Sequence, residues 1–130
     1  ELGRTWVLGK ASQEMKDEFA GVLEARKFTL SLLKPGAACK DIWDAYNAGM
    51  KKNGRPEEKR LYCHGQGYDM VERPLVRFDE PMKLKANMIV SCHPTYALAG
   101  SFNWACDNYL ITDHGPERLH QFPEIITEIG

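Results

Sequence analysis

One histidine stands in a segment that is typical of an active-site wall. Residues 62–74 read Tyr-Cys-His-Gly-Gln-Gly-Tyr-Asp-Met-Val-Glu-Arg-Pro, so that flexible glycines follow His64, and an acid and a proline come shortly after. Glycines of this kind also mark ordinary tight turns, because glycine adopts backbone angles that other residues resist. Histidine suits acid/base chemistry because its usual pKa lies near neutral pH. The segment therefore predicts either a simple turn or a site where His64 handles a proton.

Two later segments carry further candidates. In residues 89–93, period-two alternation puts Ile89, Ser91 and His93 on one face of a strand. A strand predicted around residues 104–111 presents four side chains on one face: Trp104, Cys106, Asn108 and Leu110. If both strands belong to one curved sheet, His93 and Cys106 converge on His64, and a single small ligand could touch all three.

Taken together, these segments resemble the creatinase, Xaa-Pro dipeptidase (prolidase) and methionine aminopeptidase family, peptidase M24. Residues 33–37 resemble its Lys-Pro-Gly link between helices, and residues 87–94 resemble its apolar strand that ends in Glu-Pro. Residues 106–117 resemble its Glu-Asp-Thr strand, which runs into a Gly-Pro-Glu turn. The resemblance covers nearly the whole chain. It implies the pita-bread fold, an α+β architecture in which two helices pack on one face of a curved, mainly antiparallel sheet, and it implies a homodimer.

The resemblance also exposes substitutions. In the family, a histidine like His64 and two later glutamates bind a pair of metal ions, but here His93 and Cys106 stand at the glutamate-like positions. Val71 stands where the family has a second histidine. A two-metal hydrolase needs several carboxylate oxygens to hold both dications and a bridging hydroxide. A neutral imidazole and a thiol do not supply them. The sequence therefore predicts no dinuclear metal centre and no cofactor.

Three functions remain open. The first is a hydrolase similar to creatinase or an Xaa-Pro dipeptidase, which cleaves a C–N bond of a small amide, amidine or dipeptide-like substrate. In it, His64, His93 and Glu72 form the catalytic group. The second is a single-metal hydrolase in which His64, His93 and Cys106 bind one divalent ion such as zinc and leave a place for water. The third is a catalytically inactive binding module with the same fold. We expect the first.

Three further side chains are candidates for substrate binding: Cys106, Asp107 and Arg73. An arginine can bind a carboxylate through two hydrogen bonds, although a surface ion pair would explain Arg73 equally well. Cys106 could simply pack in the core. Asp107 lies in a predicted interior strand, where a charge is costly to bury without a partner. It should therefore either contact substrate or pair with Arg4 or Arg73.

Composition narrows the class of protein. The chain has 130 residues, of which 43% are hydrophobic and 27% are charged, and this predicts one soluble globular domain. A net charge of -1 offers no basic surface for nucleic acid. No apolar run is long enough to span a membrane. The four cysteines lack metal-site or redox spacing and predict reduced thiols, so we expect a cytoplasmic protein.

Apolar residues at helical spacing predict a helix from about Ser12 to Leu33 and a second from about Ala38 to Lys52. Residues 2–9 read as a strand. In the family, this strand carries a metal-binding aspartate just before an Arg-Thr pair, so Glu1 or the residue before it would occupy that neighbourhood. The family's catalytic domain is longer than this chain. We therefore expect residues 1–130 to be the C-terminal half of that domain, partnered by a missing N-terminal half of the same protein.

Overall fold

Two helices dominate the first part of the chain. Helix α1 spans Gln13–Leu32 and helix α2 spans Cys39–Lys52, close to the predicted bounds. Ser12 caps α1, because its hydroxyl accepts a hydrogen bond from the backbone N–H of Met15 at 3.2 Å. Between the helices, Gly36 turns the chain at a φ of 85°, which glycine adopts readily. No helix in the described part of the chain is both long and apolar enough to cross a membrane.

The computed structural model describes residues 1–98 and 101–130, and these contain nine short strands. The strands are β1 (Trp6–Leu8), β2 (Cys63–Gly65), β3 (Glu72–Leu75), β4 (Ile89–Cys92), β5 (Thr95–Leu98), β6 (Ser101–Trp104), β7 (Asp107–Thr112), β8 (Gly115–Arg118) and β9 (Thr127–Ile129). The central sheet has the order β3-β2-β4-β7-β8 and is antiparallel throughout. Strands β5 and β6 form a separate antiparallel pair, and β1 pairs with β9 in parallel.

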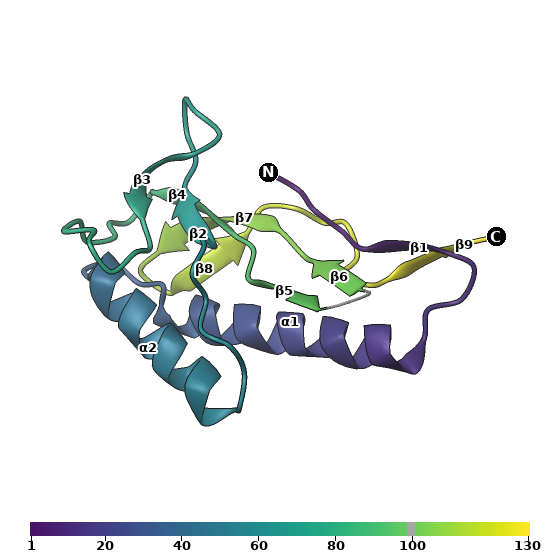
Figure 1. Ribbon diagram of the computed structural model, residues 1–130. Coiled ribbons are helices and arrows are strands. Elements are labelled where there is room, and N and C mark those ends of the chain that lie inside the picture. Colours follow the sequence, from purple (N-terminus) through teal and green to yellow (C-terminus); the bar gives the residue numbers. More distant parts are fainter. Residues whose placement is uncertain (99–100) are drawn as a thin grey trace.

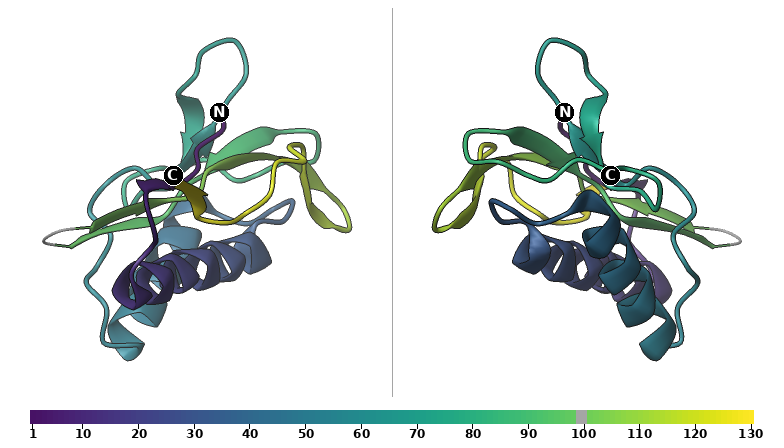
Figure 2. Two further views of the ribbon diagram at one scale, coloured as in Figure 1. Left: turned by 90° about the vertical axis from the view of Figure 1, so that its right-hand side faces the viewer. Right: turned by 90° about the vertical axis from the view of Figure 1, so that its left-hand side faces the viewer.

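Both helices lie on the same side of the strands (Figures 1 and 2). The core between the helices and the strands is made of buried apolar side chains, which include Val22, Leu33, Ile42, Tyr46, Tyr62, Leu84, Val90 and Ile111. The rings of Tyr46 and Tyr62 stack with their centroids 4.3 Å apart and so join α2 to the segment that enters β2. This confirms the predicted α+β fold, with two helices on one face of a mainly antiparallel sheet.

The central strands bring distant segments together. On β2, His64 lies opposite Ser91 of β4, which in turn lies opposite Asn108 of β7. The start of the chain joins them through a bridge between Gly3 and Cys106, with backbone hydrogen bonds of 3.1 and 3.0 Å. The loop between β2 and β3 projects away from the helices, and the N-terminus lies beside the base of this loop (Figures 1 and 2). The chemistry-bearing residues therefore gather on the side of the sheet away from the helices.

Candidate active site

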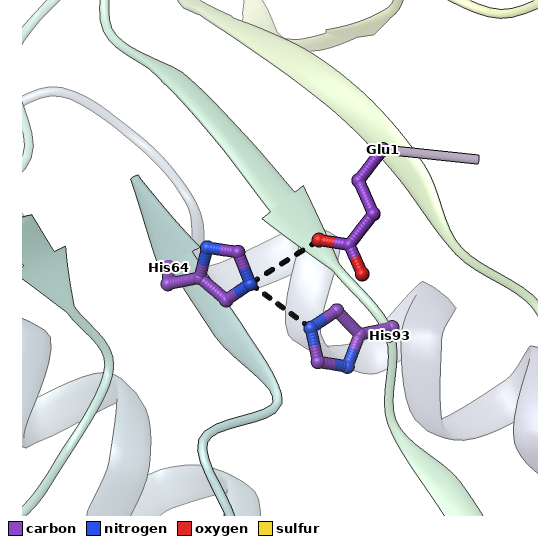
Figure 3. A group of neighbouring side chains, drawn as sticks. All are labelled: Glu1, His64 and His93. Atoms are coloured by element: carbon purple, nitrogen blue, oxygen red, sulfur yellow. Dashed lines mark hydrogen bonds and ion pairs between the residues drawn. The ribbon is translucent and has the colours of Figure 1, made fainter. Parts of the chain in front are cut away.

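Glu1, His64 and His93 form a cluster in which all three side chains point toward one another (Figure 3). Atom Nε2 of His64 lies 3.1 Å from Nε2 of His93 and 3.4 Å from Oε2 of Glu1. His64 is only 2% exposed and His93 only 7%. Among the residues that the structure describes, no other group of three His, Cys, Asp or Glu side chains brings its ligand atoms as close together. Of the predicted residues, the structure thus joins His64 and His93.

The glycines after His64 allow the tight connection that fixes its position. A Cβ at Gly65 would lie 2.7 Å from the carbonyl oxygen of Arg73, so β2 and β3 can approach this closely only with glycine there. At Gly67, a Cβ would lie 2.3 Å from Oε1 of Glu72. The Gly-Gln-Gly sequence therefore marks a packed loop beside the histidine. The glycines that indicated a tight turn are therefore the same residues that hold His64 in position.

Three residues that sequence reasoning gave no role hold the other members of the cluster. The backbone nitrogen of Glu1 donates to Oε1 of Gln66 at 2.9 Å and to Oδ1 of Asn108 at 3.0 Å. The ring of His93 stacks on Trp104, with centroids 5.3 Å apart and planes 13° apart. Strand alternation already placed Trp104 and Asn108 on one face, and that was the available signal for both.

Hydrogen bonding assigns the proton on His64. Its Nδ1 lies 3.0 Å from the carbonyl oxygen of Gly65, which can only accept, so Nδ1 carries the proton and Nε2 of the neutral ring keeps an unshared electron pair. Burial lowers the pKa of His93; Glu1 opposes this shift and His64 reinforces it, so His93 is neutral near pH 7. Oε2 of Glu1 is buried without a hydrogen-bond partner among the described residues. Nε2 of His64 can therefore accept a hydrogen bond from Nε2 of His93, and Oε2 of Glu1 faces the same point.

Cys106 lies beside the cluster but outside it. Its Sγ is 3.1 Å from Oγ of Ser91 and 3.9 Å from the backbone oxygen of Glu1. Burial raises the pKa of the thiol to about 12, so the sulfur stays protonated. The single-metal alternative placed Cys106 third beside His64 and His93. The structure gives that place to Glu1, because the sulfur is turned toward Ser91.

The buried cysteines should react slowly in the native protein. All four are free and buried, and burial raises the pKa of Cys39 to about 11 and that of Cys106 to about 12. Because the thiolate is the reactive form, we expect little reaction with Ellman's reagent at pH 8 and four equivalents after unfolding in guanidinium. Absorbance of the released chromophore measures both. Rapid labelling of one native thiol would contradict this burial.

Asp107 is fully buried in an ion-pair network. Its Oδ1 accepts a hydrogen bond from Arg4 at 2.8 Å, and its Oδ2 accepts one from Arg26 at 2.9 Å. Arg118 lies 3.4 Å from Oδ1. Arg26 and Arg118 also pair with Glu124. Of the two roles predicted for Asp107, the structure therefore provides the ion pair with Arg4, and its oxygens are occupied by arginines.

The two predicted site residues on β3 have partners outside the cluster. Arg73 binds Glu80 through two hydrogen bonds of 3.0 and 2.5 Å, and this lowers the pKa of Glu80 to about 2. The Arg73 side chain is 57% exposed. Glu72 accepts a hydrogen bond from the backbone N–H of Asp69 at 3.1 Å and so supports the loop after His64. The structure shows Arg73 in a partly exposed ion pair and Glu72 in a loop.

A pocket of about 640 Å³ opens next to the cluster and is lined by residues 1–6, Phe102 and Trp104. This volume falls within the range of small-molecule sites. Glu1 belongs to both pocket and cluster, and Trp104 joins them through its stacking on His93. Glu1 and Trp104 therefore form the wall between the pocket and the two histidines.

The cluster does not fit a pair of metal ions. Two dications held by a bridging hydroxide need several carboxylates. Among the described residues, the cluster contributes one, from Glu1. The oxygens of Asp107 are bound by arginines, and Cys106 is a neutral thiol.

Comparisons with known proteins agree with this fold. A model of metallopeptidase family M24 matches residues 1–113. An Xaa-Pro dipeptidase from Pyrococcus furiosus is 28% identical over 123 residues, which are 92% of this chain and 35% of that protein. The crystal structure of X-Pro aminopeptidase from Thermotoga maritima MSB8 has a TM-score of 0.86 at 24% identity and covers 98% of this chain and 37% of its own. The prolidase from Pyrococcus horikoshii OT3 has a TM-score of 0.82 at 26% identity and covers 94% of this chain and 36% of its own.

The chain thus spans about a third of the length of these relatives. Within that span, the match to the family model takes in Glu1, His64, His93, Cys106 and Asp107. The match covers well over half of the 130 residues. The chain belongs to metallopeptidase family M24.

Proposed function

We propose that this chain provides the reaction centre of a hydrolase that cleaves a C–N bond in a small amide, amidine or dipeptide-like substrate, at one centre rather than at a metal pair. The observation that carries the proposal is the convergence of Glu1, His64 and His93 in a buried cluster beside a pocket. The relatives named as Xaa-Pro dipeptidase and X-Pro aminopeptidase support the class of reaction. The cluster has a single carboxylate, from Glu1, and this supports one reaction centre rather than a metal pair.

The cluster is suited to holding one positive charge. Nε2 of His64, Nε2 of His93 and Oε2 of Glu1 surround one buried point, where the low dielectric strengthens the attraction of the carboxylate and of an unprotonated ring nitrogen for a positive charge. A proton taken from a water molecule could be held on Nε2 of His64, and the hydroxide that remains would attack the carbon of the C–N bond. His64 is central to this role, since it contacts both other members. His93 and Glu1 hold it in place and share the charge.

The positive charge at this point could be a proton or a divalent ion, and each corresponds to a different kind of hydrolase. A proton on His64 would make it an acid/base residue in a metal-independent enzyme of the creatinase kind. One divalent ion would make His64 a ligand in a single-metal enzyme. Either role accounts for the cluster, and both keep His64 and His93 at the reaction centre.

A turnover screen tests the proposed reaction. The full-length protein is incubated with N-acyl, amidino and Xaa-Pro compounds, with and without added Zn²⁺, and released amines are measured by mass spectrometry. We expect hydrolysis of at least one class, because the relatives are named as an Xaa-Pro dipeptidase and an X-Pro aminopeptidase and because Glu1 belongs to both the pocket and the cluster. If no class is hydrolysed under either condition, the proposal is wrong and the inactive binding module replaces it.

We also infer that the whole protein is a cytoplasmic homodimer. The dimer is inferred from the resemblance to the family. Four free cysteines are consistent with a reducing compartment. Because the relatives are longer than this chain, we expect other parts of the protein to complete the wall of the pocket beyond Trp6 and Phe102.

A further inference from the structure

We propose that Cys63 and Cys92 form an oxidisable pair, in which hydrogen peroxide joins the two thiols in a disulfide that ties β2 to β4. The two cysteines lie directly opposite each other on these neighbouring strands. Each immediately precedes a histidine of the cluster in the sequence. The pair is distinct from the reaction centre, and its oxidation does not depend on any hydrolase activity.

The hydrogen-bond register of the two strands places the thiols close enough to join. The backbone N–H of His93 donates to the carbonyl oxygen of Tyr62 at 2.8 Å. Because hydrogen-bonded and non-hydrogen-bonded pairs alternate along an antiparallel ladder, the next pair, Cys63 and Cys92, carries no ladder hydrogen bonds. The Cα atoms of such a pair are typically about 4.5 Å apart, and a disulfide accepts separations of about 4.4–6.8 Å.

The two thiols face the core, on the opposite side of the sheet from the histidines. Side chains alternate between the faces of a strand, so each cysteine points away from the histidine that follows it. Cys63 and Cys92 are fully buried among the core side chains. A hydrogen bond to the Cys92 thiol, together with burial, raises the pKa of Cys63 well above its usual value. The two sulfurs are therefore neighbours in the reduced protein.

The other two cysteines are less suited to such a bond. The sulfur of Cys106 lies 3.1 Å from the hydroxyl of Ser91, on the side of the sheet where the histidines lie. Cys39 begins α2 and shares the core, but no strand ladder of the described residues holds it opposite another cysteine. Strand pairing therefore favours Cys63 with Cys92 over any other combination.

The oxidation balances with hydrogen peroxide as the oxidant. One thiol attacks an oxygen of the peroxide and becomes a sulfenic acid, and one water is released. The second thiol then attacks that sulfur, the S–S bond forms, and the sulfenic oxygen leaves as a second water. Each sulfur gives up one electron, and the peroxide oxygens receive both. Because the thiols are buried and the thiolate is the reactive form, we expect the reaction to take hours rather than seconds.

The disulfide would restrict the strands that carry the histidines. Strands β2 and β4 are neighbours inside the five-stranded sheet, and the bond would close the chain between residues 63 and 92. A cross-link of this kind removes conformational freedom from the opened chain. We therefore expect amide hydrogen exchange in both strands to slow after oxidation, because exchange there requires local opening.

Peptide mapping by mass spectrometry tests the pair. The full-length protein is incubated with hydrogen peroxide, unfolded with an alkylating agent to block free thiols, and digested without reduction. We expect a cross-linked peptide that contains Cys63 and Cys92, lighter by two hydrogens than its two parts. Cys63→Ala should lose this product, whereas Cys39→Ala, the matched control in the same core, should keep it. Hydrogen exchange is compared between the oxidised protein and the same sample after reduction with dithiothreitol.

Three results would overturn the proposal. They are the absence of a disulfide after oxidation, a disulfide that pairs either cysteine with another partner, and unchanged hydrogen exchange in β2 and β4 of the cross-linked protein. Circular dichroism shows whether the variants are folded. If Cys63→Ala does not fold, the map of the unsubstituted protein still locates the bond and decides the question.

Discussion

Replacing Asp107 with asparagine should lower the free energy of unfolding by about 3 kcal/mol, since removing one partner of a buried ion pair commonly costs 3–5 kcal/mol. The Asp107 side chain is fully buried, and those of Arg4 and Arg26 are each 3% exposed. Asparagine keeps the shape but leaves two buried guanidinium groups without their shared anion. We expect the low end of the range, because Arg26 keeps Glu124 and Arg4 keeps backbone carbonyl partners. Urea unfolding followed by circular dichroism measures the change.

Asp113→Asn is the matched control, because Asp113 lies in the exposed turn between β7 and β8. Surface substitutions of this kind usually change stability by about 0.5 kcal/mol or less. A loss below about 1 kcal/mol for Asp107→Asn would contradict the view that the network is a main source of stability. If turnover then fell while stability stayed, Asp107 would return to the substrate contact predicted from the sequence.

The fold could be predicted largely because its signals are local. Ser12 before an apolar periodic segment, and Pro35-Gly36 after it, bound the first helix with no knowledge of the rest of the chain. Strand alternation and the order of the motifs brought His64 and His93 together. Both kinds of signal depend on neighbouring residues or on a family pattern.

The third member of the cluster was indicated only by the family resemblance, which left open whether Glu1 or the residue before it takes the aspartate-like place. Glu1 reaches His64 only because the bridge between Gly3 and Cys106 sets the register of the first residues, and because Gln66 and Asn108 hold its backbone. No local pattern encodes that contact. The same holds for Asp107, whose arginines come from the start of the chain, from α1 and from β8. The sequence named Arg4 as a candidate partner, but it did not indicate Arg26 or Arg118.

His64→Ala should reduce kcat/KM by about 100- to 10,000-fold for whichever substrate the screen identifies, the usual range for loss of a general acid or base. The expected direction is the same if His64 is a metal ligand, because Nε2 is lost in either case. His114→Ala removes an exposed imidazole from a turn and should leave kcat/KM unchanged. Steady-state kinetics of the two variants, with circular dichroism to confirm the fold, give the comparison.

A double variant shows whether the cluster acts as one unit. Residues that act together lose activity non-additively, because the first substitution already removes what the second would affect. Once His64 is alanine, Glu1→Gln should therefore cost little further activity, although alone it removes the charge 3.4 Å from Nε2. Losses that simply multiply would mean that Glu1 and His64 act separately. In that case the pocket would hold two independent functions in place of one reaction centre, and the shared positive charge would have to be abandoned.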